Sequence, residues 1–249
     1  MGKPSEYGRV YAEWKDNPEG FWAEQAEQID WFEPWTRVFD PDQGVYGRWF
    51  PGAKCNTCFN AVDRHVERGR PGQPAIIHDS PITGTKTVIT YQELREEVQA
   101  LAAVLRDLGV EKGDRVMVYM PMVPEALVAM LASARLGAVH SVVFGGFAGN
   151  ELATRIDDCH PKVIVTASCG LEPNRTVEYM PLIEHGLEEA HFAPSNLVVL
   201  QRPQHAAELK QGRDIDYRAA VDAHKHKGTV VDCVPVDATD PLYILYTSG

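Results

Sequence analysis

From residue 74 onward, short apolar runs alternate with longer amphipathic stretches. The best-defined stretch begins with Thr90 and Glu93, which have the spacing of a capping box, and its apolar stripe continues at helical spacing until Gly109. Further helices are predicted over residues 124–135, 150–158 with Asn150 as N-cap, and 176–189, and strands over residues 116–120, 138–143, 162–166 and 197–200. Such alternation is typical of parallel strands joined by crossover helices, so we predict an α/β fold with a mostly parallel sheet.

Residues 7–70 lack this alternation and are rich in Trp, Phe, Asp and Glu. Asn17 and Pro18 form a helix start, with Asn as N-cap and Pro at the first helical position. Aromatic and apolar residues follow at helical spacing, which favours amphipathic packing over a ligand surface. We therefore predict two regions, a helical and irregular segment over residues 1–73 and an α/β region over residues 74–249.

The chain ends on a pattern that can bind phosphate. The apolar run at 242–245 predicts a buried strand, and it is followed by Thr247, Ser248 and Gly249. Phosphate-binding loops place hydroxyl groups and bare backbone directly after such a strand. An ordinary strand-to-turn transition has the same pattern, so spacing alone leaves both interpretations open.

A second loop with glycines follows the strand predicted at 138–143. Ligands of open parallel sheets bind beyond the carboxyl ends of strands, which draws attention to Gly145 and Gly146. The sequence G-G-F-A-G at 145–149 does not match the dinucleotide fingerprint, and no Walker A motif occurs in the chain. A tight turn without a ligand is the alternative for this glycine pair.

Composition excludes some classes of partner and site. The chain has 24 Lys and Arg against 35 Asp and Glu, a net charge of −11, which disfavours a broad nucleic-acid surface. Its five cysteines are an odd number without a regular framework, which fits a reducing compartment. We recognise no targeting signal and no apolar stretch of membrane-spanning length, so we expect a cytoplasmic protein without a membrane partner.

Three short motifs have alternative interpretations that involve metals or catalysis. Cys55 and Cys58 form a lone C-x-x-C, and structural zinc needs four ligands. The run H-K-H-K at 224–227 suggests a metal site with Cys233, but a solvated loop is the simpler prediction. The triplet D-R-H at 63–65 consists of charged groups that could take part in catalysis.

The sequence Y-I-L-Y-T-S-G at 243–249 resembles the opening of the signature T-S-G-[ST]-T-G-x-P-K-G of acyl-adenylate-forming enzymes. Nearly the whole chain resembles the short-chain acyl-CoA synthetases of that superfamily. The matching segments are W-F-P-G at 49–52, N-A-V-D-R-H at 60–65, T-Y-Q-E-L at 90–94, K-G-D-R-V at 112–116 and G-A-V-H-S-V-V-F-G-G-F at 137–147. The segments C-G-L-E-P-N-R at 169–175 and D-P-L-Y-I-L-Y at 240–246 are more similar to propionyl-CoA synthetases than to acetyl-CoA synthetases.

The resemblance implies domains and site residues. Residues 1–73 correspond to the N-terminal synthetase segment, and residues 74–249 to the first part of the AMP-binding domain, which ends within the phosphate loop formed by Thr247, Ser248 and Gly249. Gly145 and Gly146 lie near the path of the coenzyme A pantetheine in this family. The place of the D-R-H triplet at 63–65 in the family pattern implies a structural cap rather than a catalytic role.

The resemblance also implies a cation for coenzyme A. Arg175 matches the second of two arginines that help to hold the nucleotide end of coenzyme A, whereas Glu172 replaces the first. That replacement removes a cation, adds an anion and weakens the expected phosphate site. A surface arginine in a solvated loop is the alternative for Arg175.

The family reaction has two steps. A short carboxylate attacks the α-phosphate of Mg²⁺-bound ATP to give acyl-AMP and diphosphate, and the thiol of coenzyme A then expels AMP. The cofactors and substrates implied are therefore ATP, Mg²⁺, coenzyme A and a short carboxylate, with propionate preferred over acetate. No catalytic residue or metal ligand is assigned in this chain, because the family's lysines and its carboxylate and adenine pockets match positions beyond Gly249.

We consequently expect the isolated chain to be inactive. The alternative from another class is a non-catalytic truncated product that acts as a binding or assembly partner, and the oligomeric state is left open.

Overall fold

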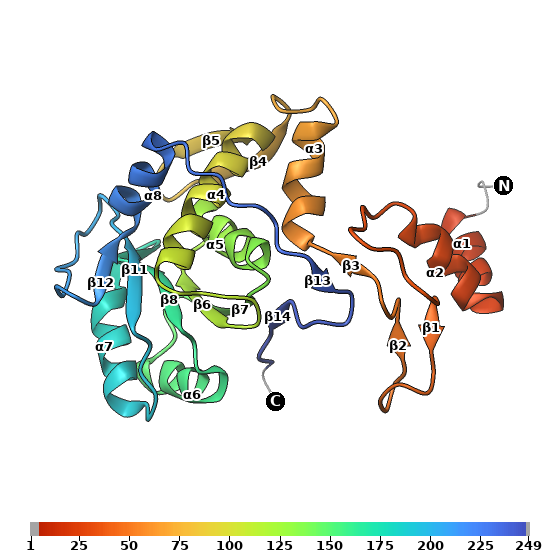
Figure 1. Cartoon of the computed structure of the whole chain (residues 1–249). Helices are drawn as coiled ribbons and strands as arrows, with labels where there is room; N and C mark the ends of the chain where they lie inside the picture. Colours follow the sequence, from red (N-terminus) through yellow and green to blue (C-terminus); the bar gives the residue numbers. More distant parts are fainter. Residues whose placement is uncertain (1–4, 248–249) are drawn as a thin grey trace. The chain divides into compact units, whose positions relative to one another are not determined.

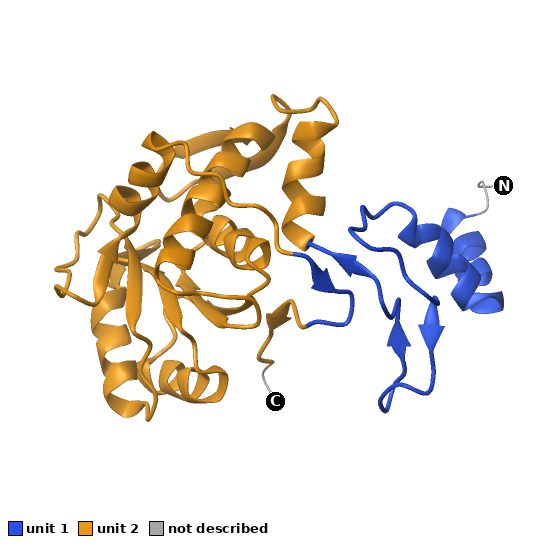
Figure 2. Ribbon diagram, viewed as in Figure 1, with its two compact units in different colours: residues 1–56, 235–240 blue, residues 57–234, 241–249 orange. Residues whose placement is uncertain are grey.

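The computed structural model describes residues 5–247 and divides the chain into two compact units (Figure 2). The smaller unit contains residues 1–56 and 235–240, and the larger unit contains residues 57–234 and 241–249. The smaller unit is therefore discontinuous in sequence, because part of it follows most of the larger unit along the chain.

The larger unit is built on a six-stranded sheet with the order β12-β11-β8-β6-β7-β14. All five pairings in this sheet are parallel. The strands are β6 (Arg115–Met120), β7 (Val139–Phe144), β8 (Val163–Ala167), β11 (Asn196–Leu200), β12 (Asp214–Asp216) and β14 (Tyr243–Ile244). The parallel α/β fold predicted from the alternating pattern is confirmed.

Helices cover the sheet in two groups. They are α4 (Tyr91–Asp107), α5 (Pro124–Arg135), α6 (Gly149–Cys159), α7 (Tyr179–Glu189) and α8 (Tyr217–His226). Helix α4 packs against α5 and α8, whereas α6 packs against α7. The chain steps from β6 to β7 in one direction and from β7 to β8 in the other, so right-handed crossovers place α5 and α6 on opposite faces. Figure 1 shows the two groups on opposite sides of the sheet.

The start of α4 agrees with its sequence pattern. The Thr90 hydroxyl accepts a hydrogen bond from the Glu93 amide at 3.3 Å, and the Glu93 carboxylate accepts one from the Thr90 amide at 2.8 Å. Just past the helix, Gly109 has a φ of +81°, a conformation that favours glycine. The capping box and the glycine stop are both confirmed.

Two local predictions in the larger unit are wrong. Asn150 is not the N-cap of α6, because the helix starts at Gly149 after Ala148, and the Asn150 side chain instead hydrogen-bonds the His185 ring at 2.9 Å. Residues 176–178 are not helical but belong to β10 (Arg175–Glu178), which forms an antiparallel hairpin with β9 (Cys169–Glu172). Because these residues pair with β9, the helix predicted from residue 176 starts only at Tyr179.

Other elements of the larger unit were not anticipated or are shorter than expected. An antiparallel hairpin of β4 (Pro74–Ser80) and β5 (Thr85–Thr90) precedes α4, and a π-helix, η1 (Phe59–Asp63), leads into the short α3 (Arg64–Glu67). The last strand, β14, has two residues rather than the four predicted.

The smaller unit contains two helices and short strands. They are α1 (Glu6–Asp16), α2 (Pro18–Ala26), β1 (Phe39–Asp40), β2 (Arg48–Trp49), β3 (Lys54–Cys55) and β13 (Val236–Asp237). The Asn17 side chain accepts a hydrogen bond from the Gly20 amide at 3.1 Å, and Pro18 opens α2, as predicted. Strand β13 pairs antiparallel with β3 and so joins the two sequence segments of this unit.

A buried ion pair connects the start of the larger unit to the end of α5. The Arg135 guanidinium donates to both carboxylate oxygens of Asp63 at 2.8 and 2.9 Å, and it also donates to the Val231 carbonyl. Burial alone would lower the pKa of Arg135, but the hydrogen bonds and nearby negative charge raise it. Asp63 is thus structural, as expected, although its side chain does not cap α3.

His140 on β7 is buried and uncharged. Its backbone amide donates to the Leu242 carbonyl at 3.3 Å, and its ring lies 5.8 Å from that of Tyr243 on β14. Its Nδ1 has no hydrogen-bond partner among the residues described, and burial lowers the pKa of the imidazole to about 4. This neutral ring makes the stability of the sheet edge sensitive to acid.

Within residues 5–247, no helix combines the length and the apolar character needed to cross a bilayer.

The ion pair leads to a prediction about stability. Arg135→Met leaves the Asp63 carboxylate buried without its partner and should reduce the free energy of unfolding by about 3–5 kcal/mol, as measured by urea unfolding. The double variant Asp63→Leu, Arg135→Met removes both charges and should recover most of that loss. A double variant as unstable as the single one would show that packing, not charge, causes the loss.

The buried imidazole predicts a pH dependence. The unfolded state binds a proton near pH 6.5, whereas folded His140 does so only near pH 4, so stability is retained above 6.5 and falls as the pH drops toward 4. Relative to His140→Leu, the native chain should lose up to about 3 kcal/mol across this window in urea unfolding. The exposed His191, whose pKa a hydrogen bond to Asp157 raises, is the control: His191→Gln should shift the curve in the opposite sense or not at all.

Candidate functional site

The two loops selected from the sequence follow neighbouring strands. Strand β14 is parallel to β7 with Tyr243 opposite His140, so residues 145–148 and Thr247 emerge at the same carboxyl edge of the sheet (Figure 1). Thr247 is exposed. Ser248 and Gly249, the rest of the predicted phosphate loop, lie outside the described residues.

Arg155 on α6 bridges these two loops, a role that the sequence analysis missed. Its guanidinium carbon lies 4.9 Å from the centre of the Phe147 ring and 5.3 Å from that of the Tyr246 ring. Glu151, one turn earlier, accepts a hydrogen bond from Arg155 at 2.7 Å. The nearby sequence shows only an ordinary helical Glu–Arg pair, so nothing in it distinguishes this arginine from a surface one.

The chain just before Thr247 is anchored on the same helix. The Tyr246 hydroxyl donates to the Asp158 carboxylate at 2.5 Å, and burial together with this hydrogen bond raises the pKa of Tyr246. Helix α6 therefore holds both the entry to the candidate phosphate loop and the loop after β7.

The glycine pair has two different environments. A Cβ on Gly145 would lie 2.2 Å from the Tyr179 hydroxyl and 2.9 Å from the Met120 carbonyl, so packing alone requires glycine there. Gly146 has a φ of +104° and faces open space. Only Gly146 therefore presents bare backbone on an open side.

A tyrosine hydroxyl shapes this loop. Tyr119 donates to the Phe147 carbonyl at 3.0 Å and accepts from the Gly146 amide at 3.1 Å. Its ring lies 5.0 Å from that of Tyr179, and burial raises the pKa of Tyr179 to about 12. Both hydroxyls therefore remain protonated at neutral pH and position the loop rather than act as bases.

Arg175 lies on the β9–β10 hairpin, which leaves the carboxyl edge directly after β8. Its guanidinium makes two hydrogen bonds to Glu172, at 2.7 and 3.1 Å, and the side chain is 69% exposed. The hydrogen bond from Arg175 lowers the pKa of Glu172. Glu172, which replaces an arginine of the family pattern, therefore pairs directly with Arg175, the cation expected to bind coenzyme A.

Large apolar side chains surround the same edge. Met122, Phe144 and Leu245 follow or end β6, β7 and β14, and they are 85%, 68% and 65% exposed. Comparably exposed apolar groups also occur elsewhere in the described chain, so these three add apolar contact to the edge rather than distinguish it. The edge offers backbone donors and apolar contact, which suits binding and positioning of a ligand.

Metal-binding candidates receive little support from the described part of the chain. The one group of possible ligands there is Cys58, Asp63 and Cys233, and Arg135 already occupies the carboxylate. His224 binds Asp107 at 3.3 Å and Thr229 at 3.2 Å rather than Cys233. Residues 224–226 end α8 and are helical rather than a loop, although Lys225, His226 and Lys227 are exposed as predicted.

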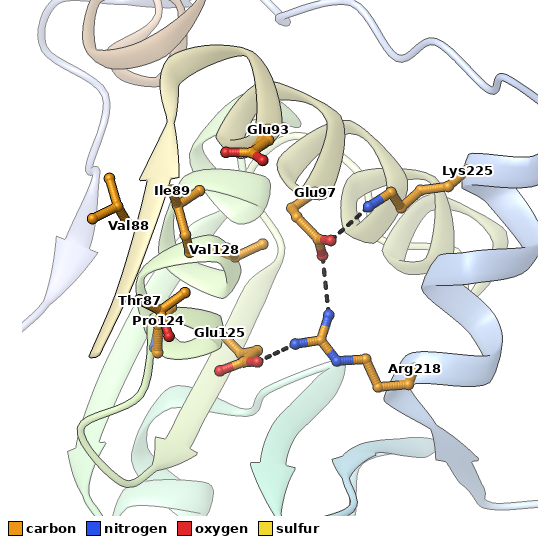
Figure 3. A pocket seen from close by; sticks show the side chains of 10 residues that line it. All are labelled: Thr87, Val88, Ile89, Glu93, Glu97, Pro124, Glu125, Val128, Arg218 and Lys225. Atoms are coloured by element: carbon orange, nitrogen blue, oxygen red, sulfur yellow. Dashed lines mark hydrogen bonds and ion pairs between the residues drawn. The ribbon is translucent and has the colours of Figure 1, made fainter. Parts of the chain in front are cut away.

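A separate cavity of about 250 Å³ lies among β5, α4, α5 and α8 (Figure 3). Arg218 donates to Glu97 at 3.3 Å and to Glu125, and Lys225 donates to Glu97 at 2.7 Å. None of the residues predicted for the site lines this cavity. Arg218 and Lys225 pair with Glu97 and Glu125, and Glu93 caps α4, so we interpret the cluster as a network that fastens α8 to α4 and α5.

The two glycines should respond differently to substitution. Gly145→Ala forces a methyl group against the Tyr179 hydroxyl and the Met120 carbonyl and should cost about 1–3 kcal/mol of stability. Gly146→Ala meets no atom and should cost about 1 kcal/mol through its positive φ alone. Urea unfolding of both variants, with Gly84→Ala as an exposed positive-φ control, tests this order, and equal losses would contradict it.

Comparison with known proteins identifies the family. Residues 62–249 match the family described as AMP-binding enzyme, and residues 7–61 match the family described as acetyl-coenzyme A synthetase N-terminus. A human protein named acyl-CoA synthetase short-chain family member 3, mitochondrial, is 49% identical over 249 residues, which is 100% of this chain and 36% of the human one. The propionate–CoA ligase of Escherichia coli strain K12 is 40% identical over 243 residues, which is 98% of this chain and 38% of the ligase.

A solved structure agrees. The acetoacetyl-CoA synthetase from Streptomyces lividans matches with a TM-score of 0.82 and 28% sequence identity, over 95% of this chain and 35% of that one. The present chain thus spans little more than a third of the length of these relatives. It belongs to the AMP-binding enzyme family, among the short-chain acyl-CoA synthetases, and corresponds to the N-terminal portion of their sequence.

Proposed function

We propose that this chain is the N-terminal part of an ATP-dependent short-chain acyl-CoA synthetase that converts a carboxylate, ATP and coenzyme A into acyl-CoA, AMP and diphosphate through acyl-AMP. The observation that carries the proposal is the shared edge of β7 and β14, where α6 holds the loop with the glycine pair beside the start of the T-S-G segment. The family resemblance assigns the T-S-G segment to the phosphates of ATP and the glycine pair to the path of the coenzyme A pantetheine.

The residues have distinct roles in this proposal. Thr247, Ser248 and Gly249 contribute donors to the phosphates of ATP, and Gly146 leaves room for the pantetheine. Gly145 supports that loop by fitting against Tyr179. Mg²⁺ enters with the ATP phosphates, and no side chain of this chain is assigned to it. Residues of the kind found beyond this portion of the relatives would complete the site.

Propionate is the proposed preferred substrate. The support is the pair of propionate-like segments at 169–175 and 240–246, and an Escherichia coli relative bears the name propionate–CoA ligase. The cytoplasm remains our proposed location, whereas the human relative is named as mitochondrial.

The proposal predicts activity only in a complete chain. Adenylyl transfer depends on preorganised donors, and loss of a single one typically costs about a hundredfold to a thousandfold in rate. We expect residues 1–249 alone to form no thioester from propionate, ATP and coenzyme A. A chain extended to the length of the relatives should form propionyl-CoA faster than acetyl-CoA, as measured by release of AMP and chromatography of the thioester.

The outcomes separate the alternatives. Thioester formation by the purified 249-residue chain above a no-enzyme control would contradict the idea that the site is completed elsewhere. Faster turnover of acetate would overturn only the substrate preference. A stop codon directly after Gly249, together with binding of a protein partner but no turnover, would favour a non-catalytic product instead.

The hairpin makes a second prediction for the extended enzyme. If Arg175 contacts a coenzyme A phosphate, Arg175→Glu should weaken coenzyme A binding by about 1.5–3 kcal/mol, whereas Glu172→Gln should strengthen it by releasing the guanidinium. Adenylation, followed by pyrophosphate exchange, should hardly change. Arg9→Glu breaks the similar exposed pair with Glu6 on α1 and is the matched control. Equal effects of the Arg9 and Arg175 variants would assign Arg175 to the solvated surface.

A further inference from the structure

Two free cysteines meet inside the larger unit although they are far apart in sequence. The sulfur atoms of Cys58 and Cys233 and a carboxylate oxygen of Asp63 all lie within 4.8 Å of one another. Cys58 is fully buried, whereas Cys233 is partly accessible. Cys55, the other cysteine of the C-x-x-C motif with Cys58, does not belong to this group.

The pair lies at two of the three places where the chain passes between units. Cys58 is the second residue of the larger unit, and Cys233 is the last but one before the chain returns to the smaller unit. Arg135 fixes both ends, because it donates to Asp63 and Val231 while its carbonyl accepts from the Val234 amide at 2.8 Å. The two sulfur atoms are therefore held by a rigid, buried hydrogen-bonded frame.

This frame favours thiol chemistry over metal binding. Both oxygens of Asp63 accept hydrogen bonds from Arg135, and an Arg135 nitrogen lies 3.5 Å from the Cys58 sulfur. A cation placed among these groups would face the guanidinium charge, and a structural zinc site needs four ligands. What remains is a pair of thiols whose sulfur atoms lie no more than 4.8 Å apart, so a disulfide of about 2.05 Å requires the two side chains to move toward each other.

We propose that Cys58 and Cys233 are an oxidisable pair that a hydroperoxide converts into a disulfide. In the first step, the sulfur of Cys233 attacks one oxygen of hydrogen peroxide and the O–O bond breaks. The attacked oxygen stays on the sulfur as a sulfenic acid, and the other oxygen leaves as water with the thiol proton. In the second step, the sulfur of Cys58 attacks that of Cys233, the S–O bond breaks, and the hydroxide leaves as water with the Cys58 proton. The two cysteines lose two electrons in total, and the peroxide is reduced to two molecules of water.

The disulfide would link the larger unit at the first two of its three chain passages. It closes a loop over almost the whole unit, and in the chain-entropy model long loops restrict the unfolded state most. It would also fix the point from which the chain proceeds to β13 and β14. The hydrogen bond with Cys58 and burial raise the pKa of the Cys233 thiol. Because the thiolate is the nucleophile, the first step is slow at neutral pH, and only prolonged exposure to peroxide oxidises the pair.

Peroxide treatment of the purified 249-residue chain tests the proposal. After alkylation of remaining thiols and digestion without reductant, mass spectrometry should find one disulfide-linked peptide pair, Cys58 with Cys233, and dithiothreitol should reverse it. The oxidised chain should unfold at a higher urea concentration than the reduced chain. Cys233→Ser should abolish the link, whereas Cys55→Ser, the matched control on the neighbouring C-x-x-C, should retain it.

Several results would overturn the proposal. They are persistence of both thiols in alkylatable form, conversion of Cys233 to sulfinic acid without a link, and a link between Cys58 and Cys55. Because the peptide map of the native chain decides among these outcomes, the conclusion stands even if a variant fails to fold. None of these measurements depends on synthetase activity.

Discussion

The position of β6 between β7 and β8 is the constraint on which the rest of the larger unit depends. The chain moves from β6 to one neighbour and then crosses to the other, so the following segments diverge on opposite faces. A crevice forms outside the carboxyl ends of the strands where such a reversal occurs. The glycine loop after β7 and the hairpin after β8 flank this reversal, which explains why both segments selected from the sequence lie at one edge.

Tyr179 shows how packing supports that edge. It is the first residue of α7, yet its hydroxyl fills the space beside both Gly145 and Gly170. The loop after β7 and the base of the β9–β10 hairpin are therefore fitted to the same aromatic ring. A sequence can suggest that a glycine leaves room for a ligand, but here a distant tyrosine uses that room at Gly145 and leaves it open only at Gly146.

The sequence predicted those helix starts that depend on contacts between residues close together in the chain. The capping box at Thr90 and the Asn17–Pro18 start were predicted correctly because their partners are within three residues. Asn150 was misassigned because a histidine 35 residues away, His185, binds its side chain. The β9–β10 hairpin was missed although its paired residues lie close together in sequence. Arg155, by contrast, contacts the Phe147 ring and also the ring of Tyr246, which lies far along the chain. Such long-range partners are invisible to a single sequence unless a family resemblance supplies them.

Charge at the candidate site is local rather than global. A chain with a net charge of −11 repels polyanionic ligands at long range, so the coenzyme A and ATP proposed as ligands would need donors placed at short distance. The Glu172–Arg175 pair keeps even the most suggestive cation neutralised in the absence of a competing phosphate. A phosphate that binds Arg175 must first displace the Glu172 carboxylate, which lowers the net gain in affinity. Ligands without a group that can replace this carboxylate are therefore disfavoured.

The discontinuity of the smaller unit has a consequence for synthesis. Strand β3 emerges about 180 residues before β13, its antiparallel partner. At about 5–20 residues per second, the β3 edge waits roughly ten to forty seconds on the ribosome while the larger unit is made. The nascent chain must therefore keep that edge from pairing with other strands until the larger unit has folded and returned β13 to it.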